Sequence, residues 1–128
     1  MNNDPEERRA ILLRAMDRFE EVLAKDLEAE PALVDSAIQR FEFSIELFWR
    51  LLQSVLEREG VRVASPRAAF RAAYAQGWLD GEAIWLAMID DRNRTSHTYD
   101  EGIAQDVLSR LPSHLQAMRE ALARIPRD

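Results

Sequence analysis

Residues 92–99 of the chain, Arg-Asn-Arg-Thr-Ser-His-Thr-Tyr, form a strongly polar segment that directly follows an apolar run. If a helix continues through this segment, Asn93 and His97 are four residues apart on one face, and Arg92 and Ser96 are paired in the same way. An arginine binds a phosphate with its fork of donors, and a histidine transfers a proton near neutral pH. The segment therefore has side chains suited to cleaving a phosphodiester, with Arg92, Asn93 and His97 as candidate catalytic residues.

A structural role explains the same residue types. The two arginines of the segment would then be solvated or paired with Asp90 and Asp91, and His97 would help to end the helix against its dipole. Asn93 has the same two interpretations, because it would either orient the substrate or the imidazole, or serve as a residue of a helix C-terminus. Periodicity by itself does not separate the catalytic interpretation from the structural one.

Two carboxylates precede this segment on a different predicted helix. Glu42 and Glu46 are four residues apart, close to the apolar stripe that includes Phe41 and Ile45. A partly buried carboxylate needs a partner, so one of them is a candidate to hold Arg92 in place; otherwise both are solvated glutamates of an amphipathic helix. The chain has no Glu-x-x-His element and only one well-placed histidine, so we expect no metal site. We also expect no other cofactor.

The stretch between Val61 and Leu79 is the one basic strip of an acidic protein. It contains Arg62, Arg67 and Arg71 and no acidic residue. The last two arginines share a helical face, so the strip would guide an RNA backbone or meet an acidic partner surface, unless it is a solvated helix face.

The elements that position these residues are predicted to be helices. Asp4-Pro5 starts the first helix with an N-cap and a proline, and its apolar positions continue to Leu27 before the break at Pro31. The second helix ends at Gly60. Its apolar stripe consists of Ile38, Phe41, Ile45, Phe48, Leu52 and Val55.

Three further helices follow, and no segment has the alternation of a strand. Ser65-Pro66 starts the third helix, which stops at Gly77, and Asp80 caps the fourth. Asp100 caps a last helix that Pro112 bends or splits. We therefore predict an all-α protein, an antiparallel bundle with short connections. The large aromatic residues Trp49, Trp78, Trp85, Phe41 and Phe48 are expected to fill the core or a dimer interface.

Composition limits the classes of function. A chain of 128 residues with 47% hydrophobic residues is expected to form one domain over residues 1–128. The net charge of -6 argues against a general attraction to nucleic acid, so any contact with RNA must be local. The chain has no cysteine, and neither a signal peptide nor a membrane span is predicted, so we expect a cytoplasmic protein.

The residues of the polar segment also resemble the signature of a known group of proteins, the HEPN superfamily. The resemblance comes from the spacing of Arg92 and His97, with Asn93 directly after the arginine and Tyr99 two residues after the histidine. Over nearly the whole chain, the sequence is similar to the small proteins described as nucleotidyltransferase substrate-binding subunits. The similar residues are Gln39-Arg40-Phe41-Glu42, Glu46, Trp49, Ser65-Pro66-Arg67, Trp85 and Asp91-Arg92-Asn93.

The resemblance implies a four- or five-helix bundle that forms a homodimer and works with a minimal nucleotidyltransferase. In toxin-type pairs the helical protein is a metal-independent endoribonuclease and the nucleotidyltransferase is its antitoxin, which in some systems adenylylates the tyrosine of the motif. By position, Tyr99 would be that target. One protomer offers only His97 and a distant His114, so a symmetric dimer would supply the second histidine of the site.

Two other functions are compatible with the same residues. In the first, the chain is a non-catalytic subunit that binds a nucleotide or another substrate for the nucleotidyltransferase, with Arg92 and His97 holding a phosphate. In the second, it is a dimeric helical interaction module without a ligand of its own. The toxin-type ribonuclease is our first interpretation, and the non-catalytic binding subunit is the alternative.

Overall fold

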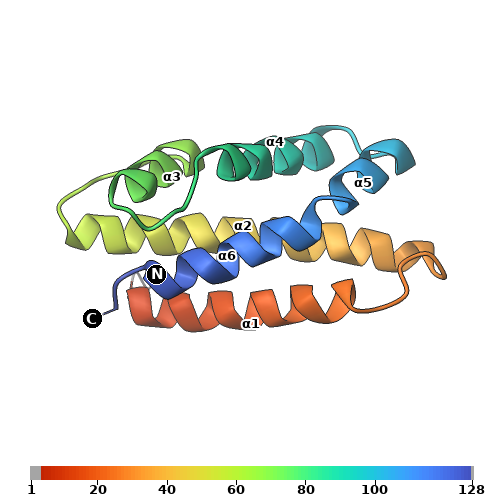
Figure 1. The fold of residues 1–128 in the computed structure, drawn as a ribbon, viewed down its shortest axis with the longest axis horizontal. Helices are drawn as coiled ribbons and strands as arrows, with labels where there is room; N and C mark the ends of the chain where they lie inside the picture. The colour runs from red at the N-terminus through yellow and green to blue at the C-terminus, as the bar shows by residue number, and fades with distance from the viewer. Residues whose placement is uncertain (1–3, 128) are drawn as a thin grey trace.

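Residues 4–127 are described in a computed structural model, and they form six α-helices and no strand. In chain order, these are α1 (Pro5–Leu23), α2 (Pro31–Arg58), α3 (Pro66–Ala75), α4 (Ala83–His97), α5 (Glu101–Leu108) and α6 (Leu111–Arg124). The long helices α1 and α2 run antiparallel, and α3 and α4 follow one another along another side of α2 (Figure 1). The chain then returns through α5, and α6 packs against α1, α2 and α4. The prediction of an all-α antiparallel bundle is confirmed.

Most helix ends lie where the caps and breakers of the sequence predict them. The side chains of Asp4, Ser65 and Asp100 each accept a hydrogen bond from a backbone N–H of the following helix, at 2.8–3.2 Å. Gly60 has a φ of +83°, a conformation that favours glycine, and it directly follows the C-cap of α2. Pro112 lies at the start of α6, so the predicted last helix is split into α5 and α6.

Two predicted helix boundaries are wrong. The first helix ends at Leu23 instead of Leu27, because the Asp26 carboxylate accepts the backbone N–H groups of Glu28 and Ala29 and forms a turn there. The fourth helix has Glu82 as its N-cap residue instead of Asp80.

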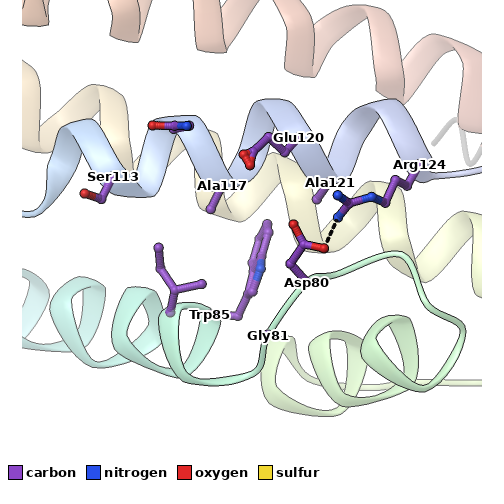
Figure 2. A pocket seen from close by; sticks show the side chains of 10 residues that line it. Asp80, Gly81, Trp85, Ser113, Ala117, Glu120, Ala121 and Arg124 are labelled. Atoms are coloured by element: carbon purple, nitrogen blue, oxygen red, sulfur yellow. Dashed lines mark ion pairs between the residues drawn. The ribbon is translucent and has the colours of Figure 1, made fainter.

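Asp80 has a different role in the structure. Its carboxylate forms an ion pair with Arg124 of α6 at 2.8 Å, beside a pocket that Trp85 also lines (Figure 2). This contact connects the loop before α4 to the last turn of α6. The pocket contains none of the residues that the sequence suggests for chemistry.

One hydrophobic cluster runs through the bundle, and its largest side chains come from α1, α2, α3 and α4. Trp85 is 1% exposed, and its ring centroid lies 4.8 Å from that of Phe48 and 4.9 Å from that of Phe70. The other predicted core aromatics are buried as well: Phe41, Trp49 and Trp78. Packing of Trp85 against Phe48 and Phe70 fixes α4 against α2 and α3. No helix within residues 4–127 is long and apolar enough to cross a membrane.

Arg9 is a buried charged residue that connects the two ends of the chain. Its guanidinium donates hydrogen bonds to the backbone carbonyls of Leu122, Ile125 and Pro126 at 3.0–3.1 Å. These carbonyls lie at the C-terminal end of α6, where backbone acceptors have no partner within the helix and a positive charge is favourable. Arg9 therefore caps α6 from α1.

Candidate functional site

The C-terminal half of α4 carries the polar segment. The helix continues to His97, which places Arg92, Asn93 and His97 within its last two turns. Asn93 and His97 are exposed, and the Arg92 side chain is 40% exposed. Within residues 4–127, the His97 imidazole has no hydrogen-bond partner. The segment thus presents an imidazole, an amide and a guanidinium at the surface of one helix.

Glu46 of α2 lies beside Arg92. One oxygen of its carboxylate, Oε2, is 3.7 Å from Arg92 Nη2 and accepts a hydrogen bond from the Trp49 indole at 2.9 Å. The other, Oε1, is 3.3 Å from Nε of Arg50. The structure brings Glu46 and Arg92 together at an ion-pair distance, and the indole restricts the orientation of the carboxylate. A small cavity of about 30 Å³ lies at this contact, and its lining includes Arg92, Asn93 and Pro66.

Glu42 does not contact Arg92. Its carboxylate accepts hydrogen bonds from the hydroxyls of Thr95 at 2.5 Å and Ser96 at 3.4 Å. Glu42 thus joins α2 to the last turns of α4, immediately before His97. Of the two carboxylates considered from the sequence, Glu46 lies beside the arginine of the motif and Glu42 beside the turn that carries its histidine.

Asp91, the residue before Arg92, is the centre of a buried network that sequence reasoning missed. It is 3% exposed, and its two oxygens accept hydrogen bonds from Arg110 at 2.6 and 2.9 Å and from His114 Nε2 at 2.8 Å. Burial by itself would raise the pKa of Asp91, but the hydrogen bonds from Arg110 and His114 outweigh it and leave the pKa below its usual value. An ionised Asp91 therefore fixes α4 to α6.

His114 is close to the motif in space but is not accessible from it. The residue is 1% exposed, and its ring stacks on Phe41 with a centroid distance of 5.5 Å. Burial lowers the pKa of His114 in spite of the neighbouring Asp91. The imidazole is thus neutral at pH 7 and donates from Nε2, while its buried Nδ1 has no hydrogen-bond partner. His114 supports the helix and does not reach a substrate.

Arg94 contacts the same network from the protein surface. Its guanidinium forms an ion pair with Asp106 of α5 at 2.6 Å and lies 3.7 Å from Asp91. Asp106 also pairs with Arg110 at 3.0 Å, and the hydrogen bonds from Arg110 and Arg94 lower the pKa of Asp106 to about 2. The structural interpretation thus describes Arg94, which pairs with Asp91, whereas Arg92 pairs with Glu46 instead.

Tyr99 lies just beyond α4 and is 47% exposed. Its hydroxyl donates a hydrogen bond to the carboxylate of Asp35 near the start of α2. Partial burial and the bonded carboxylate raise the pKa of Tyr99 to about 12, so the phenol keeps its proton at neutral pH. Tyr99 and Asp35 line a groove of about 580 Å³ between the ends of α2 and α5.

The three arginines of the basic strip are at least partly exposed. Arg62 lies in the connection between α2 and α3, and Arg67 and Arg71 lie on α3. Within the described part of the chain, none of them forms an ion pair. Pro66, the residue before Arg67, lines the small cavity beside Arg92, so one residue of the strip lies next to the motif.

The fold and the motif at the end of α4 together define a helical protein of the HEPN type. The chain belongs to the family described as nucleotidyltransferase substrate binding protein like, which it matches over residues 8–127. The resemblance of the sequence to nucleotidyltransferase substrate-binding subunits is thereby confirmed.

Solved structures have the same fold. A crystal structure of a protein from Thermus thermophilus matches with a TM-score of 0.82 at 38% sequence identity, covering 91% of this chain and 99% of that chain. A Haemophilus influenzae protein matches with a TM-score of 0.76 at 25% identity, covering 93% of this chain and 99% of that chain. Its structure is described as revealing the fold of a substrate binding domain of a nucleotidyltransferase.

A curated relative has an activity in its name. Probable ribonuclease HepT of Haemophilus influenzae is 31% identical to this chain over 91 residues, which make up 67% of this chain and 62% of HepT. The match thus spans less than two thirds of the length of that protein.

Proposed function

We propose that this protein is a metal-independent endoribonuclease whose active site lies at the C-terminal end of α4. The observation that carries the proposal is the surface placement of Arg92, Asn93 and His97 on the last two turns of one helix, with Glu46 beside the guanidinium. An imidazole without a protein partner is free to exchange protons with a ligand. The name of the relative HepT is consistent with this activity.

The chemistry would be transfer of a phosphoryl group within the RNA. His97 removes the proton of a ribose 2′-hydroxyl, the 2′-oxygen bonds to phosphorus, and the bond from phosphorus to the 5′-oxygen breaks. A general acid returns a proton to that leaving 5′-oxygen. Arg92 stabilises the charge that develops on the non-bridging oxygens, and Asn93 orients the substrate or the imidazole. These steps use side chains alone.

The site needs a second proton-transfer group, and a homodimer would provide it. His114 is buried and neutral, so one protomer contributes only His97. A two-fold contact that includes the outer face of α4 would bring two copies of His97 to one phosphate, one as base and one as acid. The proposed site is therefore composite.

The partner of this protein would be a minimal nucleotidyltransferase with an antitoxin role in the cytoplasm. The family description and the substrate-binding fold reported for the Haemophilus influenzae structure support such a partner. Tyr99 would accept the nucleotidyl group of a nucleoside triphosphate, with pyrophosphate as the leaving group, because the phenol is half exposed and Asp35 is in position to take its proton. The group would lie just beyond the helix end that carries His97, and so would block access of RNA to that residue.

The basic strip would bind the RNA backbone on one side of the motif. Arg62, Arg67 and Arg71 are accessible and form no ion pair within residues 4–127, and Pro66 of the same strip lies beside Arg92 and Asn93. Tyr74 is 45% exposed on the same helix as the last two and would stack on a base.

The decisive experiment is cleavage of total RNA by the purified protein in excess chelator. Wild type is compared with His97→Ala and Arg92→Ala, after circular dichroism has established that all three fold alike. Arg50→Ala is the matched control for Arg92→Ala, because Arg50 also contacts Glu46 and is also a partly exposed arginine. The proposal requires cleavage by wild type and Arg50→Ala, and loss of about 100-fold or more in both motif variants.

A second function has its own supporting observation, the description of the family as substrate-binding. In that case Arg92 and His97 hold a phosphate of a nucleotide for the nucleotidyltransferase without cleaving it. A wild-type protein that is inert towards RNA, even when it is produced without its partner, would contradict the ribonuclease and favour this binding subunit. Nucleotide binding that is lost in Arg92→Ala would then identify the site.

A further inference from the structure

A groove lies between α1 and α2. Of the residues discussed so far for chemistry, only Glu46 lines it. It has a volume of about 470 Å³. Its apolar part is formed by Ile11, Ala15, Phe43 and Leu47. Phe43 is 48% exposed and Ile11 is 36% exposed, so two large apolar side chains of the groove reach the surface. The groove thus offers an aromatic face to solvent.

Three arginines surround this aromatic face. Arg14 and Arg18 come from α1, and Arg40 comes from α2. Within residues 4–127, Arg14 and Arg40 form no ion pair, and Arg18 contacts only the exposed Glu21, at 3.5 Å. In a protein with a net charge of -6, a group of three guanidiniums with so few carboxylate partners is a local site for an anion.

The groove adjoins the small cavity beside Arg92, because the two have one lining residue in common. Glu46 lines the groove and also the small cavity beside Arg92 and Asn93. The same carboxylate is within ion-pair distance of Arg92. A ligand that extends from the phosphate on Arg92 across α2 would therefore enter the groove.

We propose that this groove is an RNA subsite that holds a nucleotide next to the phosphate that is cleaved. The base stacks on Phe43, and the neighbouring phosphates contact Arg14 and Arg40. Exposed aromatic rings beside arginines are the general means by which proteins bind single strands without reading their sequence. The inference rests on the proposed ribonuclease function, and it adds a second contact region on the far side of Arg92 from the basic strip.

Charge complementarity favours a polyanion over a second copy of the chain as the occupant. A two-fold contact centred on the groove would bring the arginines of both copies, Arg14, Arg18 and Arg40 from each, into one interface. Like charges at a buried contact are costly, whereas phosphates would neutralise them. An acidic polypeptide is the remaining rival, and a binding experiment separates it from RNA.

The test is binding of a fluorescently labelled single-stranded oligouridylate to protein in the His97→Ala background, measured by fluorescence anisotropy. Phe43→Ala should weaken binding about 5- to 100-fold, which is the range for loss of one stacked base. Arg14→Ala and Arg40→Ala should each weaken it and reduce the slope of log affinity against log salt by about 0.7.

Two control variants account for general effects of charge and surface. Arg124→Ala removes the same charge from the pocket between α4 and α6, and Leu13→Ala removes an apolar side chain that is 37% exposed on α1 but does not line the groove. Both should bind the oligouridylate within about twofold of the background protein, since surface changes away from a site have small effects.

The inference is overturned if Phe43→Ala, Arg14→Ala and Arg40→Ala bind RNA as the controls do, or if the background protein does not bind it. Loss of a homodimer in these variants, with RNA binding unchanged, would assign the groove to a second copy. Loss of the nucleotidyltransferase complex with unchanged RNA binding would assign it to an acidic partner. Failure of the ribonuclease proposal is distinct, because a non-cleaving wild type can still bind RNA through the groove.

Discussion

The buried network around Asp91 gives a sharp prediction for Asp91→Asn. Asparagine has nearly the same size and leaves no cavity, so the substitution tests the charge. The carboxylate accepts two hydrogen bonds from Arg110 at 2.6 and 2.9 Å and one from His114 at 2.8 Å, and the Asp91 side chain is 4% exposed. An amide keeps one acceptor and presents two donors to a guanidinium that has only donors. We therefore expect a clear loss of stability.

The magnitude follows from the partners that are lost. Breaking a buried ion pair by removing one partner costs about 3–5 kcal/mol. Arg110 is 35% exposed and keeps Asp106 as a partner, so loss of its contact with Asp91 costs less than loss of a fully buried ion pair. The hydrogen bond of His114 contributes about 1 kcal/mol. We expect Asp91→Asn to lower the free energy of unfolding by about 3 kcal/mol, which corresponds to a decrease of about 10 °C in Tm for a domain of this size.

Urea unfolding followed by circular dichroism measures this change. Asp90→Asn is the matched control, because Asp90 is the preceding residue of α4, carries the same charge and is exposed. Its effect should stay within about 0.5 kcal/mol. If Asp91→Asn destabilises no more than Asp90→Asn, the buried carboxylate does not fix α4 to α6, and the argument from the network fails.

Three further predictions concern the other buried or bonded polar groups. Arg9→Met should lower the free energy of unfolding by about 2–3 kcal/mol in urea, because three carbonyls at the end of α6 lose their donor. The Tyr99 phenol should titrate with a pKa of about 12 by ultraviolet absorbance, and Asp35→Asn should bring this pKa closer to the ordinary value of 10.0. The folded-state pKa of His114 lies below the unfolded value, so the unfolded chain takes up the proton first as the pH falls. The free energy of unfolding, measured in urea, should therefore decrease as the pH drops below about 6.5. His114→Gln should remove this dependence on pH.

Each of these has a control and a contradicting outcome. Arg9→Lys keeps the charge but loses the planar set of guanidinium donors, so it should recover only part of the stability that Arg9→Met loses. Equal stability of Arg9→Met and wild type would contradict the capping role. The phenol titration is done in a Tyr74→Phe background, and an unchanged midpoint in Asp35→Asn would refute the bond to the carboxylate. A slope below about pH 6.5 that survives in His114→Gln would have to come from other groups.

The sequence contains enough local information to predict the helices. Proline after a capping residue, as in Asp4-Pro5 and Ser65-Pro66, sets a helix start through short-range geometry. Glycine at Gly60 sets an end in the same way. The placement of the polar segment on α4 was also predictable, because the helix continues to His97 without a breaker. The family resemblance depends on this segment together with residues over nearly the whole chain, and it is confirmed by the match over residues 8–127.

Contacts between helices were not predictable from these patterns. Glu42 and Glu46 have the same spacing relative to the apolar stripe, and only the rotation of α2 against α4 places Glu46 beside Arg92 and Glu42 beside Thr95. The Asp91 network joins residues about twenty positions apart, and two consecutive acids before Arg92 give no sign of which is buried or of its partner. The Asp80 prediction was wrong because a capping residue type also forms ion pairs with distant residues, here Arg124.

The capping of α6 by Arg9 has a consequence for the order of folding. Arg9 and Leu122 are 113 residues apart, so this contact closes nearly the whole chain into a loop. The α1–α2 hairpin closes a much shorter loop, and loop entropy therefore favours its formation first. We expect docking of α6 onto Arg9 after the transition state of folding. Arg9→Lys would then accelerate unfolding and leave the refolding rate nearly unchanged in stopped-flow measurements, whereas slower refolding would place the closure of the chain ends in the nucleus.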